Sequence, residues 1–213
     1  MTEWPIVLTY APSVRRPGLE ALWALDAMLG GILRSTREPL VGQMRLTWWH
    51  EALRALDDGP APAEPRLAAL SASVLPFGVT GAALGEVVSA WEVLLAQPLG
   101  RAELLAHAEG RGAGLFDAAT VVLGEAMPSV ALAGQGWALA DVARNLSDER
   151  LAGEARALAE ERLAAALSVR WPRALRMLGA LAWSARLDLA VPARPAGHPA
   201  RMARLLRFRL TGR

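Results

Sequence analysis

Helical periodicity is the feature of this sequence that most constrains its fold. Along most of the 213 residues, apolar side chains recur at intervals of three and four, which places them on one face of an α-helix. Strand signals are absent from the sequence, because no alternating β-branched run is bounded by hairpin turns. The sequence therefore predicts an all-α fold, a bundle of about seven to nine helices.

Breaks rich in proline and glycine divide the chain into these predicted helices. Residues 57–60 end the second predicted helix, and residues 61–65 form the clearest loop. The predicted helices span about 17–33, 38–56, 66–75, 81–97, 101–124, 129–146, 149–167, 172–189 and 199–210. Three prolines between residues 191 and 199 set the last helix apart. We therefore expect one helical domain over residues 1–190 and a basic C-terminal extension with a short helix over residues 191–213.

Composition narrows the classes of function. The chain has no cysteine, which excludes disulfides, thiolate metal sites and cysteine nucleophiles. All 23 basic residues are arginine, but the net charge is only +2, so charge gives no support for a nucleic-acid partner. No apolar run approaches the ~20 residues that span a bilayer. We expect a cytoplasmic protein, soluble or peripheral to the inner membrane.

Several segments carry a family pattern. Residues 15–26 lead into Gly-x-Met-Arg-x-x-Trp-Trp at 42–49, and a helix rich in small residues at 110–124 ends in Leu-Gly. Together with residues 134–149, these segments resemble the squalene/phytoene synthase family, including the branch that assembles respiratory complex I. The resemblance covers about residues 8–167 and implies an isoprenoid synthase fold.

Active members of that family condense two prenyl diphosphates and hold Mg²⁺ between two facing D-x-x-x-D motifs. Carboxylates at i and i+4 share a helix face, and Mg²⁺ prefers oxygen ligands. Here the first motif falls on Gly30, Gly31 and Arg34, which cannot form a magnesium ligand set. Asp26, one turn earlier, shares a face with Gly30 and is the nearest acid.

The second motif is only partly lost. Aligned on Arg144, the family pattern places Asn145 and Glu149 at its acid positions, with Asp141 one turn before Asn145. We expect these three side chains on one helical face. With Asp26 they are the candidate metal ligands and the remnant of a catalytic site. The alternative is an ordinary helix end with capping residues and solvated charges.

Arginines near the first motif are candidate ligand-binding residues. Arg34, Arg37 and Arg45 could bind a diphosphate or a lipid head group, because guanidinium forks match phosphate oxygens. Trp49 and Arg144 complete this set. Alternatively, the arginines are surface or ion-paired residues in a chain without lysine. Trp49 and the tryptophan before it cannot both point inward, so one of the two should be exposed.

Two further features have two interpretations each. The glycines at 110, 112 and 114 either permit a close approach of helices or line a cavity for an isoprenoid chain. The C-terminal stretch from Arg194 to Arg213 carries six arginines and no acid, interleaved with apolar residues. It either contacts anionic lipid or docks on the bundle with a solvated arginine face.

Two functional hypotheses follow from the resemblance. The first is a non-catalytic protein that needs no cofactor and acts as an assembly or isoprenoid/lipid-binding factor. Its partners would be a prenyl diphosphate or another isoprenoid lipid, a membrane surface or a respiratory assembly partner. The alternative is a Mg²⁺-dependent prenyltransferase of squalene/phytoene-type isoprenoid biosynthesis. The loss at Gly30, Gly31 and Arg34 favours the first hypothesis.

Overall fold

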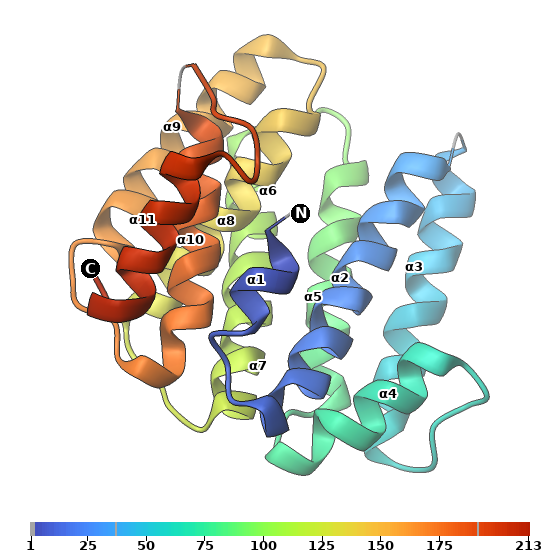
Figure 1. Ribbon diagram of the computed structural model, residues 1–213. Coiled ribbons are helices and arrows are strands. Elements are labelled where there is room, and N and C mark those ends of the chain that lie inside the picture. Colours follow the sequence, from blue (N-terminus) through green and yellow to red (C-terminus); the bar gives the residue numbers. More distant parts are fainter. Residues whose placement is uncertain (1–2, 37, 191) are drawn as a thin grey trace.

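The computed structural model describes residues 3–36, 38–190 and 192–213, and every regular element in these ranges is helical (Figure 1). The α-helices are α1 (Trp4–Leu8), α2 (Arg16–Ser35), α3 (Pro39–Arg54), α4 (Pro65–Ser73), α5 (Gly81–Glu92), α6 (Arg101–His107), α7 (Gly114–Leu123), α8 (Ser129–Asn145), α9 (Glu149–Ala166), α10 (Arg176–Leu189) and α11 (Pro199–Thr211). A π-helical segment, Ala108–Ala113, joins α6 and α7 into one continuous helix, so the described residues form ten helices. The predicted all-α class is confirmed, and the expected number of about seven to nine is close.

Local chemistry explains where the helices begin and end. The side chain of Asp148 accepts a hydrogen bond from the N–H of Leu151 and caps α9, and Thr80 caps α5 in the same way. Gly124 ends α7 with a φ of +75°, a conformation that glycine adopts without strain. α1 has no counterpart among the predicted helices, because five residues are too few to show a helical period.

The helix α8 lies at the centre of the bundle, where it packs against α9, α10 and the π-helical segment, while α3 packs against α5 on another side (Figure 1). An aromatic core joins three of the long helices. The rings of Trp23, Phe116 and Trp137 lie 5.7–6.2 Å apart between centroids. Trp4 of α1 stacks on Trp23 at 5.1 Å, so the short first helix also covers the core.

Glycines let the continuous α6–α7 helix approach α8 closely. A Cβ atom on Gly112 would collide with the backbone carbonyl of Gly134, and a Cβ atom on Gly134 would collide with the carbonyl of Gly112. Close helix approach, one of the two roles expected for the glycines at 110–114, is therefore confirmed at Gly112. The contact also brings Arg111, the neighbour of Gly112, close to α8.

The last helix, α11, docks on α10. Leu205 and Phe208 are buried in this contact, and the ring of Phe208 lies 6.4 Å from Trp171 and 6.5 Å from Trp183 between centroids. The opposite side of α11 remains exposed. Across the described ranges, no helix combines the length and the apolar character that crossing a bilayer requires.

Candidate functional site

A buried arginine occupies the centre of the bundle. Arg111 belongs to the π-helical segment and is only 2% exposed. Its Nε donates a hydrogen bond to Asp26 Oδ1 at 2.7 Å, and its Nη2 donates to Asp26 Oδ2 at 2.9 Å. This two-pronged contact ties the α6–α7 helix to α2, and paired hydrogen bonds of this kind are the strong form of an ion pair.

The same guanidinium also reaches α8. Its Nη1 donates a hydrogen bond to Asp141 Oδ2 at 2.8 Å. Burial alone would lower the pKa of Arg111, but the charges of Asp26 and Asp141 outweigh it and raise this pKa. Burial likewise raises the pKa of Asp141, and Arg111 and Arg144 together bring that pKa below its usual value. One permanent positive charge therefore links two carboxylates on different helices.

Aromatic rings enclose the guanidinium on two sides. The Arg111 Cζ atom lies 4.1 Å from the ring centroid of Trp91 and 4.5 Å from that of Trp137, within cation–π range. Trp91 also donates from Nε1 to Asp26 Oδ1 at 3.2 Å. These contacts exclude water from the ion pair and hold its members in one geometry.

A buried histidine completes the surroundings. His107 Nδ1 lies 2.7 Å from the carbonyl oxygen of Ala90, which can only accept, so Nδ1 carries the proton. The Nε2 lone pair then faces Arg111 Nη1 at 3.5 Å. Burial and the charge of Arg111 lower the pKa of His107 to about 3. The ring is therefore neutral at physiological pH.

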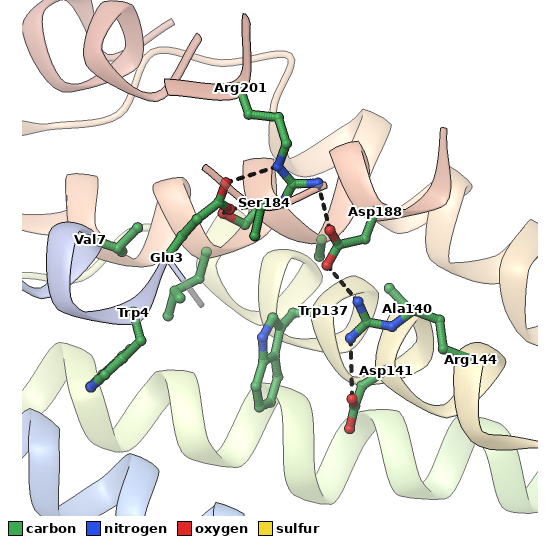
Figure 2. A pocket seen from close by; sticks show the side chains of 13 residues that line it. Glu3, Trp4, Val7, Trp137, Ala140, Asp141, Arg144, Ser184, Asp188 and Arg201 are labelled. Carbon is green, nitrogen blue, oxygen red and sulfur yellow. Dashed lines mark hydrogen bonds and ion pairs between the residues drawn. The ribbon is translucent and has the colours of Figure 1, made fainter. Parts of the chain in front are cut away.

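The charged cluster continues from Asp141, through the exposed Arg144, to a second buried ion pair as a chain of alternating charges, which Figure 2 shows from Asp141 onward. Arg144 donates to Asp141 at 3.4 Å and to Asp188 at 2.6 Å. Arg201 then donates to Asp188 at 2.6 Å and to both carboxylate oxygens of Glu3 at 2.8 and 2.7 Å. The chain connects the residue before α1, and α8, α10 and α11, to the buried cluster. Its members, in order, are Glu3, Arg201, Asp188, Arg144, Asp141, Arg111 and Asp26.

The structure brings together some of the predicted metal ligands. Asp26 and Asp141 lie on either side of Arg111, and the Asn145 side chain donates to the carbonyl oxygen of Asp141 at 2.7 Å. The expectation that Glu149 shares a helical face with Asp141 and Asn145 is wrong. The helix α8 ends at Asn145, and Glu149 is the first residue of α9, where it is exposed.

The predicted ligand-binding residues do not converge on one point. Arg34 lines a small cavity near Asp141, whereas Arg45 reaches Thr36 at 3.5 Å on the exterior of α3. Trp49 is buried and the tryptophan before it is half exposed, so the expected difference within that pair is confirmed. Arg144 joins the charge chain. Arg37 lies outside the described residues.

Two cavities adjoin Asp141. One, of about 290 Å³, lies beneath α1 and is bordered by the charge chain from Glu3 to Asp141. The other, of about 270 Å³, lies between α2 and α8. It has mainly apolar walls and is lined by Gly30, Leu33, Arg34, Trp91, Leu94, Asp141, Val142, Asn145 and Leu146. Each cavity is slightly smaller than the pockets that usually hold a compact organic ligand.

The arrangement does not suit a metal ion. Both oxygens of Asp26 and one of Asp141 already accept from Arg111. Over the described ranges, no three His, Cys, Asp or Glu side chains are grouped so that they could hold a metal. Arg111 and His107 were not among the predicted site residues. The signal in the sequence was Arg111 between two glycines in a helix rich in small residues, where close packing would bury a charge that then needs partners.

The fold and the site define an all-α protein whose centre is an arginine held between carboxylates from two helices. Comparison with protein-family models, curated proteins and solved structures finds no match for this chain. Function is therefore inferred from the geometry and from the motifs in the sequence.

Proposed function

We propose that this chain is a non-catalytic, squalene/phytoene synthase-like protein that acts as an assembly factor or an isoprenoid- or lipid-binding factor. The observation that carries the proposal is the buried contact of Arg111 with Asp26 and Asp141. In the family that the sequence resembles, acids of two facing helices hold Mg²⁺. Here the acids of the two corresponding helices hold a guanidinium of the chain itself.

A guanidinium in this position cannot take over the chemistry of the metal. Two edges of Arg111 are taken by Asp26 and Asp141, and its faces are covered by Trp91 and Trp137. Few N–H groups are left to bind a diphosphate. The arginine is also covalently fixed, so it cannot arrive with a substrate, as Mg²⁺ commonly does in phosphate chemistry.

The available space favours binding over condensation. Joining two prenyl diphosphates requires both chains in one cavity, whereas the cavities beside Asp141 measure only about 290 and 270 Å³. The second of these has apolar walls that include Leu33, Trp91 and Leu146, with Arg34 at its border. Such a site suits one short isoprenoid segment or part of a lipid chain, with its head group toward Arg34.

The proposal is tested by assaying the purified protein with farnesyl and geranylgeranyl diphosphate in the presence of Mg²⁺. We expect no condensed product and no release of diphosphate. The alternative, a prenyltransferase, predicts product formation that Asp141→Ala or Glu149→Ala abolishes. That result would refute the non-catalytic proposal. An Asp58→Ala control that forms as much product as the unmodified chain would show that the loss of activity is specific to Asp141 or Glu149.

We further propose that the protein works in the cytoplasm at the periphery of the inner membrane, where a respiratory assembly partner would be located. The family resemblance supports the kind of partner, and the exposed arginines of α11 support the location.

A further inference from the structure

The outer side of α11 combines exposed leucines with arginines. Leu206 is 53% exposed and Leu210 is 70% exposed, one helical turn apart on the side that faces away from α10. Arg207 and Arg209 flank this pair and are also exposed. On an ordinary solvated helix face, the positions farthest from the core are polar. This helix instead exposes apolar side chains there and surrounds them with positive charge.

The loop between α9 and α10 extends the same surface. Arg170 Nε donates to the carbonyl oxygen of Thr211 at 3.1 Å, which holds the loop against the end of α11. Val169, which precedes Arg170 in the sequence, is 40% exposed. Arg173, three residues after Arg170, is also exposed. We call this set the α11 surface, and it consists of Val169, Arg170, Arg173, Leu206, Arg207, Arg209 and Leu210.

The arginines of the α11 surface are not neutralised. In the residues that the structure describes, none of its four arginines forms an ion pair with a carboxylate. Arg176, beside the surface, donates to the carbonyl oxygens of Arg209 and Leu210 at 2.6 and 3.2 Å. Burial, Arg170 and Arg173 lower the pKa of Arg176, which reflects the concentration of positive charge.

Part of this surface forms one wall of a wide groove between α11 and the segment that follows α1. The groove has a volume of about 1150 Å³, and Arg173, Leu206, Arg209 and Leu210 of the α11 surface line it. Glu125 also lines it and is the one acid among its described lining residues. The groove therefore adds room for anionic groups beside a surface that is already positive.

We propose that the α11 surface is where this protein docks on an anionic lipid bilayer. Arginines beside a bilayer are attracted to anionic head groups, and leucines on the same side enter the boundary between head groups and acyl chains. An acidic protein partner is the competing occupant. Charge favours lipid. The four arginines of this surface form no ion pair among the described residues, and lipid head groups bring negative charge together with the acyl chains that Leu206 and Leu210 can contact.

A second exposed apolar face provides a comparison. Leu40, Met44 and Trp48 lie one turn apart along α3, and each is at least half exposed. The helices α3 and α11 lie at opposite sides of the bundle, so a flat bilayer cannot contact both (Figure 1). We assign the membrane contact to α11 because, among the described residues, exposed arginines are more numerous around its leucines than around the apolar face of α3. The inference rests on the proposed function only for the presence of a membrane, and none of its residues belongs to the Arg111 cluster.

The test is flotation of the full chain with vesicles of phosphatidylcholine mixed with phosphatidylglycerol, and with vesicles of phosphatidylcholine alone. We expect binding only to the anionic vesicles, and raised salt should weaken it because salt screens exposed charges. Arg207→Gln with Arg209→Gln should weaken binding on the order of twentyfold, since each arginine near an anionic surface contributes roughly a fivefold factor. Leu206→Ser with Leu210→Ser should also weaken it.

Matched variants on other surfaces serve as controls. Arg54→Gln with Arg150→Gln removes two exposed arginines elsewhere, and Leu40→Ser with Met44→Ser removes exposed apolar residues from α3. Both should bind as the unmodified chain does, and all variants should keep its melting temperature. Loss of binding in the α3 variant would overturn the inference, as would failure of the unmodified chain to bind anionic vesicles at low salt. Neither outcome bears on the Mg²⁺ assay, so the two proposals fail separately.

Discussion

At the scale of single residues, the cost of burying Arg111 explains why its partners are so many. A guanidinium taken out of water loses several kcal/mol of solvation, and only close, well-oriented carboxylates offset that loss. Asp26 and Asp141 provide them, and Trp91 and Trp137 cover the faces. Removing the arginine alone would leave the buried Asp26 without a cation and Asp141 with only the more distant Arg144, at a cost of about 3–5 kcal/mol. The cluster therefore stabilises the fold only as a complete set.

The pKa of His107 leads to a prediction about pH. This pKa lies at about 3 in the folded protein against the ordinary histidine value of 6.5, so between these pH values the unfolded chain binds a proton that the folded protein does not bind. Stability is then full above pH 6.5 and falls as the pH is lowered toward about 3, by up to about 1.4 kcal/mol per pH unit from this group. Urea unfolding measured across this range should show that slope.

The variant His107→Asn should flatten the dependence between pH 6.5 and about 3. Its amide can still donate to the Ala90 carbonyl, but it does not titrate. The smaller side chain lowers the stability at every pH, so the slopes are compared and not the absolute values. His50→Asn, on α3, is the control. If stability fell with pH equally steeply in His107→Asn and in the unmodified chain, the pKa of His107 would not be the cause of this dependence.

At the scale of elements, the crossing of the α6–α7 helix and α8 positions Arg111, and this crossing depends on glycine. Gly112→Ala would push a methyl group into the carbonyl of Gly134. We expect it to lower the free energy of unfolding by about 1–3 kcal/mol or more, because backbone atoms cannot move aside as side chains do. Chemical denaturation measures this change.

A glycine on α9 provides the matched control. Gly153 is also helical, but a Cβ atom there meets nothing within 4 Å. Gly153→Ala should therefore stabilise the protein by about 0.5–1 kcal/mol, the usual gain from replacing glycine inside a helix. If both alanine variants behaved alike, the close contact at Gly112 would not govern the packing of α8.

The sequence predicts the helices well and the site less well, for a physical reason. Periodicity predicts each long helix because one face of each is buried in the core. The helix α1 was not predicted because it is too short to show a period. The direction of Arg111 depends on the π-helical segment, which shifts the helical register and leaves no simple periodic trace. Asp26 and Asp141 were predicted from motif spacing, but their partner comes from a third helix that the motifs do not include.

At the scale of the whole molecule, the charge chain joins both ends of the described chain to its centre. Glu3 precedes α1 and Arg201 belongs to α11, and their buried ion pair is linked through Asp188 and Arg144 to Asp141. The docking of α11 and the order of the central cluster are thus parts of one network. The α11 surface lies on the outer side of this same helix, so the proposed membrane contact and the core share a structural element.

The central claim is that Arg111 supplies the cation between Asp26 and Asp141. The most direct measurement is a titration of the unmodified protein with Mn²⁺, an analogue of Mg²⁺, followed through the paramagnetic resonance signal of the free ion. The account predicts that Asp141→Asn and Asp26→Asn change nothing in the signal, because these carboxylates bind no metal. Uptake of Mn²⁺ by the unmodified protein that either substitution removes would contradict it.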